Sequence, residues 1–414
     1  MTFFPRDPRR ALLLAVSCCC LQATAATTDP WGYIVHTVPA GSQRLVGVSL
    51  TGYATFYGTV TGVTATGLTF GEPVSDNLFR ESSSAFLTVR KGAFAGLALT
   101  VTSYSGHEIT LEQSAAEWIA PGDEIQVFAN HTIGDLFGDQ NQAGLLAAGD
   151  AAAADTIGLW NPQTQSSRVF YFRAGDGWRE AGHEDAGDQS NVTVPYPAAL
   201  VINRRASTPF QFTLIGGVPM PLENRYFQVA PGRNLISAPF TAASRIADYG
   251  LYESGSPYSV LGAMSAPEAD TIRLSNFSAA TDSQVMYYRL GEGWRFAGTD
   301  GDSGETPIEL GQSMDFQRRG PVGIIKALGI AEERSRSAAR SISVPAVPIR
   351  RMIPALGGMQ IEWTGEAGAT YQIQTRPTGD AAWTDLGGPV TGSGESFSSL
   401  CKPSGQGFLR IVMH

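Results

Sequence analysis

Short runs in which apolar and polar residues alternate are the main pattern of the chain, and they predict β-strands. Within residues 60–130 the runs SAFLTVRKG, LALTVTS, HEITLEQ and DEIQVFA each alternate or stay apolar over a strand's length, and a Pro121-Gly122-Asp123 turn joins two of them. Helical periodicity is confined to Ile133 to Phe137 and the Ala-rich 147–154. The pattern predicts an all-β protein, with a small β-barrel or meander at about 60–130.

One hairpin pattern occurs twice. VFYFRAGDGWREAG at 169–182 matches VMYYRLGEGWRFAG at 285–298, with nine identical positions out of fourteen. In each copy two apolar strands flank a Gly-x-Gly turn, which can adopt positive φ, and a tryptophan (Trp178 or Trp294) opens the return strand. The repetition predicts two modules with the same fold.

The repeat extends on both sides of the hairpin. Upstream, DTIGLWN at 155–161 corresponds to DTIRLSN at 270–276, and VPAGSQRLVGVSL at 38–50 is similar to VAPGRNLISAPF at 229–240. Downstream, Arg204-Arg205 corresponds to Arg318-Arg319. These matches predict tandem β-sandwich or barrel-like modules, of which the first is longer because it contains the 60–130 segment.

A predicted organisation follows from these patterns and from changes in composition. It consists of a signal peptide at 1–25, a first module at 26–220 carrying the insert, a second module at 221–327, a linker at 328–348 and a C-terminal β unit at 349–414. The linker is polar, rich in small residues and ends in prolines.

The first 25 residues have the three parts of a secretory signal. Arg6, Arg9 and Arg10 form a basic start, Ala11 to Leu21 is apolar, and Ala23-Thr24-Ala25 offers small residues for cleavage. The apolar run is too short for a permanent transmembrane helix. We therefore expect a protein that is secreted, periplasmic or on the surface of a bacterium, without a transmembrane anchor.

The cysteines leave one alternative open. Ala15-Val16-Ser17-Cys18 partly resembles a lipoprotein cleavage site, although such sites usually carry Leu where Ala15 stands. Cleavage of the signal would leave Cys401 as the single cysteine, so no intramolecular disulfide could form and the core must supply the stability.

Charge and motifs exclude several function classes. Removing Arg6, Arg9, Arg10 and Asp7 with the signal leaves 26 basic against 37 acidic residues, a net charge near −11, which disfavours nucleic acid and anionic lipid as partners. The chain has no G-x-S-x-G elbow, no H-E-x-x-H, no phosphate loop, and no histidines at metal-ligand spacing. We therefore predict that it is not an enzyme.

Two acidic loops are candidates for calcium. His183 to Asp188 follows the first hairpin and Asp300 to Glu305 the second, and both alternate carboxylates with glycine. Calcium prefers six to eight oxygen ligands, so Asp300 and Asp302 are candidate ligands. Solvated turns favour the same residues for backbone reasons, and no cofactor is otherwise expected.

Carbohydrate is the other candidate ligand. Trp178 and Trp294 would stack on sugar rings if their faces were exposed, whereas large aromatics more often fill the core of a β module. Exposure of the two rings separates these alternatives. Because residues shared by both modules are explained by the shared fold, a specific ligand is expected where the modules differ, which is in the 60–130 insert and in the loops around residues 183–188 and 300–305.

Two resemblances add to this picture. The PGRNLISAPF strand, the Gly122 to Ile125 turn, the Thr132 to Phe137 segment and the Trp178 hairpin resemble a family of secreted bacterial proteins of unknown function. That resemblance implies export and a β fold, but no activity.

The last 65 residues resemble a fibronectin type III-like sandwich. IEWTG, TYQIQTR, AWTDLG and FLRIVM stand where such domains keep their tryptophan, tyrosine and closing strands. The unit is shorter than the usual ~100 residues, so it either lacks a strand or borrows one. Domains of this kind serve as spacers or binding modules.

The sequence as a whole predicts an exported, non-enzymatic structural, adhesive or scaffold protein of the cell envelope or extracellular space. The alternative is a polysaccharide-binding accessory protein, and a hydrolase is less favoured. The expected partners are polysaccharide or other envelope proteins.

Overall fold

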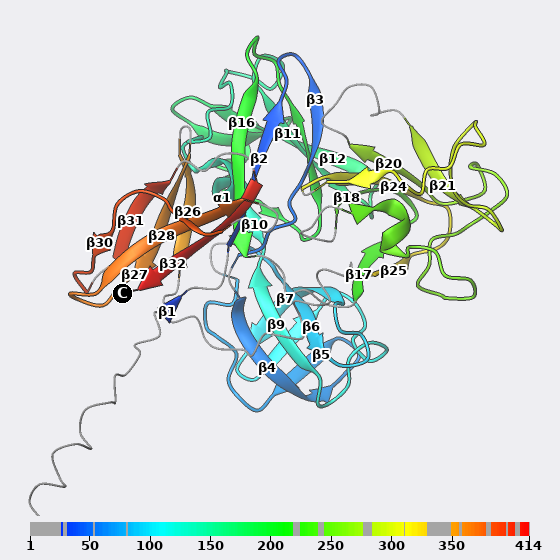
Figure 1. The fold of residues 1–414 in the computed structure, drawn as a ribbon, viewed down its shortest axis with the longest axis horizontal. Helices are drawn as coiled ribbons and strands as arrows, with labels where there is room; N and C mark the ends of the chain where they lie inside the picture. The colour runs from blue at the N-terminus through cyan, green and yellow to red at the C-terminus, as the bar shows by residue number, and fades with distance from the viewer. Residues whose placement is uncertain are drawn as a thin grey trace, which may run out of the picture.

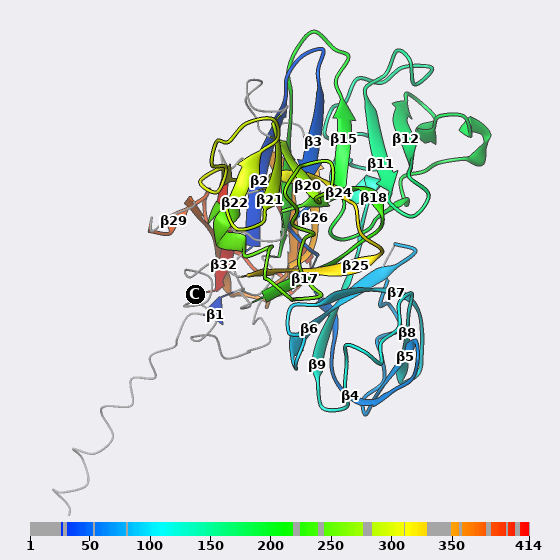
Figure 2. The same ribbon diagram turned by 90° about the vertical axis from the view of Figure 1, so that its right-hand side faces the viewer.

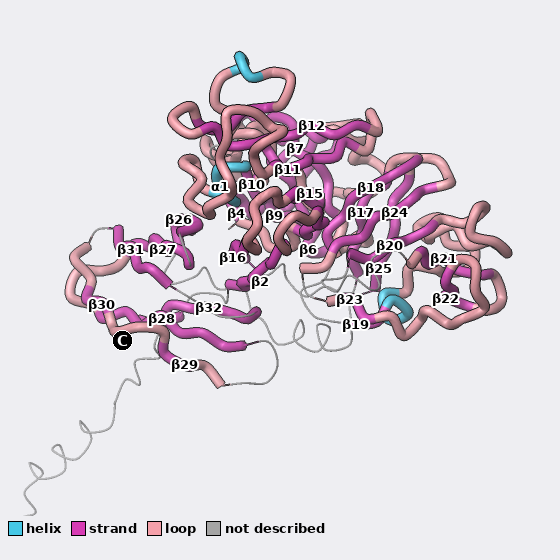
Figure 3. Tube along the Cα trace, turned by 90° about the horizontal axis from the view of Figure 1, so that it is seen from above, coloured by secondary structure: helices cyan, strands magenta, loops and turns pink. Residues whose placement is uncertain are grey.

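The computed structural model describes residues 26–27, 31–52, 54–79, 82–217, 224–238, 244–275, 284–309, 311–328, 349–355, 358–377, 382–394, 396–401 and 406–413. Strands dominate these residues, and their only α-helix is α1 (Ile133–Phe137) (Figure 3). The all-β prediction is confirmed.

The first module is built on a five-stranded antiparallel sheet with the order β13-β12-β11-β15-β3. Its strands are β3 (Gln43–Gly47), β11 (Thr156–Asn161), β12 (Ser166–Arg173), β13 (Gly177–Glu180) and β15 (Ala199–Asn203). The repeated hairpin forms β12 and β13, and the DTI block opens β11.

The second module has a sheet with the equivalent order, β22-β21-β20-β24-β18. Its strands are β18 (Gly232–Ser237), β20 (Thr271–Ser275), β21 (Val285–Arg289), β22 (Gly293–Phe296) and β24 (Ser313–Arg318). Each strand has its counterpart in the first module at the same place in the order. The duplication seen in the sequence is therefore a duplication of the fold.

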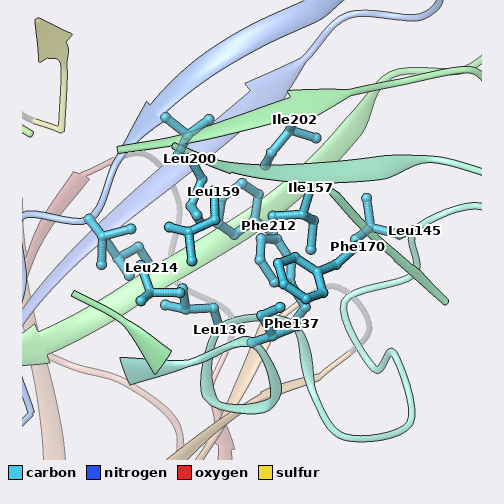
Figure 4. Packing of buried hydrophobic residues seen from close by; sticks show 14 of the residues in the cluster. Leu136, Phe137, Leu145, Ile157, Leu159, Phe170, Leu200, Ile202, Phe212 and Leu214 are labelled. Carbon is cyan, nitrogen blue, oxygen red and sulfur yellow. The ribbon is translucent and has the colours of Figure 1, made fainter. Parts of the chain in front are cut away.

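A second layer covers each sheet. In the first module β2 (Trp31–Val38) pairs with β16 (Phe210–Gly217), and in the second β17 (Asn224–Val229) pairs with β25 (Gly323–Leu328). Apolar side chains fill the space between the layers, as alternation on each strand requires. Figure 4 shows this for the first module, where Ile157, Phe170 and Ile202 of the sheet face Phe212 and Leu214 of β16.

The duplication extends beyond the sequence match. A short strand, a helical turn and a distant partner strand recur in both modules as β10 (His131–Thr132), α1 and β14 (Thr193–Val194), and as β19 (Ser244–Arg245), the 3-10 helix η3 (Ile246–Tyr249) and β23 (Pro307–Ile308). In each copy an aspartate three residues into the turn accepts a backbone N–H, Asp135 from Thr132 and Asp248 from Arg245.

A closed six-stranded barrel interrupts the first module. Its strand order is β4-β5-β8-β7-β6-β9, with β4 (Ala54–Val63), β5 (Gly67–Phe70), β6 (Ala85–Lys91), β7 (Ala98–Ser105), β8 (Glu108–Leu111) and β9 (Glu124–Ala129). It lies between β3 and β10, whereas in the second module β18 is followed in the order of described elements by β19. The barrel starts at Ala54, slightly earlier than the predicted 60.

The barrel packs against the second module (Figure 2). Tyr226 of β17 lies in the barrel's core cluster, and its backbone N–H donates to the Gly96 carbonyl at 3.1 Å. Gly96 has φ +97°, and a Cβ there would lie 1.9 Å from the Asn224 carbonyl oxygen, so this close approach requires glycine. The rings of Phe94 and Tyr258 extend the aromatic contact.

Backbone hydrogen bonds join the two modules. The Ser237 N–H donates to the Pro197 carbonyl at 2.7 Å, and its Oγ donates to the Ala198 carbonyl at 2.9 Å. The Gly47 N–H donates to the Gly311 carbonyl at 3.3 Å. The barrel and both modules therefore form one connected body (Figure 1).

The C-terminal unit shares a sheet with the first module. One of its layers is β26 (Ile349–Ala355), β27 (Gly358–Thr364) and β31 (Ser396–Cys401); the other contains β28 (Thr370–Pro377) and β32 (Gln406–Met413). β32 pairs with β2, so strands of the first module and of the C-terminal unit form one sheet with the order β16-β2-β32-β28-β29. The short strands β1 (Ala26–Thr27), β29 (Thr384–Asp385) and β30 (Val390–Thr391) join this sheet at its margins.

This pairing shows how a unit of 65 residues completes a two-layered fold. Residues 31–34 of β2 lie in register with 406–409 of β32, so the unit borrows a strand from the start of the chain. Tyr33 of β2 accordingly belongs to the core cluster of the C-terminal unit, beside Trp363 and Tyr371. The boundary predicted at residue 349 divides the sequence, but residues on both sides of it share one packed core.

Other predictions concern the Ala-rich segment, the linker, the signal peptide and membrane-spanning helices. The Ala-rich 147–154 is turn and coil instead of helix, because Asp150 accepts the Ala153 N–H and Leu146 donates to Asp155. Leu328 belongs to β25, and the rest of the predicted linker, 329–348, lies outside the described residues, as does the predicted signal peptide. Within the described ranges, no helix has the length and apolar character needed to cross a membrane.

Candidate functional site

A buried ion pair stands at the start of the DTI block in the first module. The Asp155 carboxylate is fully enclosed and accepts hydrogen bonds from Arg204 Nη1 and from the Arg205 backbone N–H. It also accepts the Leu146 N–H at 2.8 Å. Burial of the carboxylate is tolerated because a guanidinium and two backbone donors satisfy it.

The second module repeats this arrangement. Asp270 accepts Arg318 Nη1 at 2.5 Å, the Arg319 N–H at 2.6 Å and the Leu261 N–H at 2.8 Å. The pair holds a loop against the end of the sheet in both copies, so its role is structural. In the sequence, the aspartates and the arginine doublets each recur in both modules. Their joint repetition was the available indication that the aspartate pairs with the arginine.

The repeated tryptophans are core residues. Trp178 is 0% exposed, and its Nε1 donates to the Gly138 carbonyl at 2.9 Å. Trp294 is 5% exposed and packs edge-on against Tyr288, with ring centroids 5.8 Å apart. Neither ring has a face free for a sugar, so the hypothesis that these two residues bind carbohydrate does not fit the structure.

Arginines engage the acidic loop of the second module. The Asp300 side chain is 95% exposed, and its Oδ1 accepts Arg289 Nη1 at 3.0 Å. Asp302 Oδ1 accepts the Gly304 N–H at 2.8 Å and lies 3.5 Å from Arg295 Nη1. The two carboxylates are thus tied to separate arginines of the hairpin.

In the loop of the first module, Asp188 accepts the Trp178 N–H at 2.8 Å and the Ser190 hydroxyl. Among the described residues, no group of three or more His, Cys, Asp or Glu side chains is placed to hold a metal ion. Calcium at these loops stays a prediction.

Cys401 is also a core residue. Its side chain is buried in the C-terminal unit, and desolvation raises the pKa of its thiol to about 11. A thiol with this pKa is protonated at neutral pH and is a poor nucleophile.

The junction of the barrel and the two modules contains a cavity of about 700 Å³, which we call the junction groove. All three parts of the chain line it, and the residues come from segments far apart in the sequence. Its aromatic residues are Phe86, Trp160, Tyr196 and the buried Phe227. Its amide side chains are Gln113, Asn161, Gln163, Gln189, Asn191, Gln228 and Asn234.

The aromatic residues of the groove are held in place. Tyr196 stacks on Phe86 of β6 with ring centroids 4.3 Å apart and planes at 11°, and its N–H donates to Asn130 Oδ1 at 3.0 Å. Trp160 Nε1 donates to the Arg233 carbonyl at 2.8 Å, and the Arg233 guanidinium lies 5.5 Å from the centre of its ring. Trp160 and Tyr196 are both partly exposed.

The polar side chains of the groove connect its walls. Gln113 of the barrel donates from Nε2 to Gln228 Oε1 of β17 at 2.9 Å. Arg168 forms a bidentate pair with Glu180, at 2.9 and 2.7 Å, and this hydrogen bonding lowers the pKa of Glu180. The groove thus offers amides and aromatic rings, with its arginine already paired, and its lining also contains the carboxylates of Glu112 and Asp188.

Such a lining suits a neutral, hydroxyl-rich ligand. Aromatic faces contact the apolar side of a sugar ring, while amides donate and accept for its hydroxyls. The sequence did not identify these residues as a site, because they meet only through the packing of three units. One signal was available: Trp160 stands where the second module has Ser275, so the aromatic residue is not demanded by the shared fold.

Comparison with known proteins supplies no independent assignment, since no protein-family model and no curated protein matches the chain.

Proposed function

We propose that this chain is an exported, non-enzymatic scaffold or adhesive protein that holds a polysaccharide in the junction groove. The observation that carries the proposal is the combination of partly exposed Trp160 and Tyr196 with amide side chains in one cavity. The signal-like N-terminus supports export, and the lack of catalytic motifs in the sequence supports a binding role.

The connected architecture suits a scaffold. A ligand in the groove would touch the barrel and both modules at once, and these parts are joined by backbone hydrogen bonds and aromatic packing. A site of this kind is preorganised, so little ordering free energy opposes binding.

The test is a glycan array with the chain lacking residues 1–25, followed by titration calorimetry with the glycans that bind. Trp160→Ala and Tyr196→Ala should each weaken binding about tenfold or more, which corresponds to about 1.4 kcal/mol. Tyr57→Ala is the matched control, because Tyr57 is a 54% exposed aromatic residue that does not line the groove.

Binding that survives both groove substitutions, or that falls equally with Tyr57→Ala, would contradict the groove as the site. Release of reducing ends from a bound glycan would contradict the non-enzymatic role and favour the hydrolase alternative.

A further inference from the structure

A cluster of arginines lies on the outer face of the second module's sheet. Arg233 of β18, Arg273 of β20 and Arg319 after β24 line a hollow of about 760 Å³, which we call the arginine hollow. Asp315 of β24 is its one acidic residue. Three guanidinium groups thus surround one carboxylate, on a chain whose net charge is −9.

The register of the sheet explains the arrangement. Asp315 stands directly opposite Arg273 in the β20–β24 pair, and its Oδ2 lies 3.9 Å from Arg273 Nη1. Arg233, from the neighbouring strand, binds both carboxylate oxygens at 3.0 Å. Asp315 therefore neutralises mainly the positive charge of Arg233.

The other two guanidinium groups keep donors available. Arg273 is 47% exposed, at the limit of ion-pair distance from Asp315. Arg319 is exposed, and no described residue forms an ion pair with its side chain.

The first module shows that the fold does not require this cluster. At equivalent register positions it has Gln43 for Arg233, Gly158 for Arg273 and Val201 for Asp315. A Cβ on Gly158 would lie 3.3 Å from Val201 Cβ, so a side chain there would require Val201 to move by a few tenths of an ångström.

Neighbouring positions on the same face are unchanged, with Thr156 and Tyr171 matching Thr271 and Tyr287. Two sheets with equivalent strand order thus carry different faces, because the second has arginines at two positions, 233 and 273, where the first has none, while Arg205 and Arg319 are common to both. The difference lies in side chains that the scaffold leaves unconstrained, which is where a ligand-specific site is expected.

The arginine hollow adjoins the junction groove. Arg233 lines the hollow, and its guanidinium stands over the ring of Trp160, which lines the groove. The backbone of Arg233 is fixed by Trp160 Nε1 and by Gln165, whose Oε1 accepts its N–H at 2.8 Å. A chain lying in the groove and continuing past Trp160 would reach the hollow.

We infer that the arginine hollow is an anion subsite, which binds the carboxylate or sulfate groups of an acidic polysaccharide. This inference rests on the proposed function, because it places the neutral part of the ligand in the groove. Planar guanidinium groups bind carboxylate and sulfate oxygens through paired N–H donors, and the surrounding negative charge would repel acidic polymers elsewhere on the surface.

The experiment compares oligogalacturonate with its methyl ester, since esterification removes the charge and adds only a methyl group, and it includes a sulfated dextran oligosaccharide as a second acidic probe. The double variant Arg273→Gln/Arg319→Gln should weaken binding of the acidic forms about tenfold or more while leaving the ester within about twofold. It should also reduce the salt dependence of binding. Arg205→Gln is the matched control, because Arg205 is the exposed equivalent of Arg319 in the first module.

The outcomes separate this inference from the proposed function. Ester and acid bound equally by the native chain, with the double variant unaltered, would overturn the subsite while the groove stands. Acid binding lost in the double variant but retained in Trp160→Ala would support the subsite and contradict the groove. Stabilisation by free sulfate that depends on Arg273 and Arg319, without binding of any oligosaccharide, would identify a free anion as the ligand and overturn the polysaccharide.

Discussion

The two modules have the same strand order, and each has its own buried Asp–Arg pair, but the parts of the chain that are attached to them differ. The first carries the barrel between β3 and β10 and receives the C-terminal unit along β2. Within its described residues the second has neither attachment, and it bears the arginine hollow. The comparison shows that duplication supplied a stable frame, while insertions and surface substitutions made the two copies different.

The opening strands illustrate the difference. β2 lies between β16 and β32, whereas β17 forms a two-stranded sheet with β25. The second module instead packs against the barrel, through Tyr226 of β17. An exposed strand edge is a site for unwanted pairing, and covering it with another part of the chain removes that hazard.

Removal of the C-terminal unit should have the largest effect. A chain ending at residue 328 loses β28 and β32, which uncovers the edge of β2 and the Tyr33 side chain. In the full chain this side chain is only 2% exposed. Each large apolar side chain exposed costs about 1.5–3 kcal/mol, so we expect aggregation or loss of cooperative unfolding, measured by solubility and calorimetry.

The control keeps all strands. A chain cut at a protease site inserted between residues 329 and 348 should retain the C-terminal fragment during size exclusion, because β32 stays paired with β2. A truncated chain with an unchanged melting temperature would show that the unit is an independent domain.

Loss of the buried ion pair should affect both modules similarly. Asp155→Ala and Asp270→Ala each leave a buried arginine, Arg204 or Arg318, without its carboxylate, which costs about 3–5 kcal/mol in the free energy of unfolding. Urea titration measures the loss.

Asp176→Ala is the matched surface control. Asp176 is 49% exposed and pairs with Arg173, so its removal should cost under about 1 kcal/mol. Losses of that small size for Asp155→Ala and Asp270→Ala would argue against the pair as the anchor of both modules.

His36 should make the first module sensitive to acid. Burial lowers the pKa of His36 to about 4 from its usual 6.5, because the charged imidazole would lose its hydration. The unfolded chain therefore gains a proton that the folded chain lacks as pH falls below 6.5, and about 3 kcal/mol of stability disappears by pH 4.

The second module has Phe227 at the equivalent strand position, two residues before the matched Val229, as His36 precedes Val38. His36→Phe should thus reduce the fall in stability between pH 6.5 and pH 4, monitored by urea titration at several pH values. An unchanged pH profile in this variant would mean that another group controls acid sensitivity.

Calcium should have the smallest effect. Because Asp300 and Asp302 are held by Arg289 and Arg295, a cation would have to displace both arginines, and we expect saturating calcium to change the melting temperature by under about 1 °C. A rise of several degrees that Asp300→Asn/Asp302→Asn removes would instead establish the loop as a calcium site.

Much of the architecture was accessible from the sequence because its causes are local. Alternation along SAFLTVRKG and its neighbours predicted the strands of the barrel, and the Gly-x-Gly turns predicted both hairpins. The Ala-rich 147–154 misled, since side-chain hydrogen bonds of Asp150 and Asp155 outweigh helix propensity there. For Trp178 and Trp294 the core was the favoured expectation, because large aromatics usually fill it, but only the opposite layer decided that both rings are buried.

The sequence by itself determined the strands, the turns and the repetition, because side-chain period and turn conformation act over a few residues. Only the tertiary structure decided that β2 completes the C-terminal unit, since that pairing joins residues 31–34 to residues 406–409. It also decided where the proposed binding surfaces lie. The junction groove exists because three separately predicted units pack together and bring Trp160, Tyr196 and Arg233 to one place, whereas the arginine hollow is lined by the second module alone.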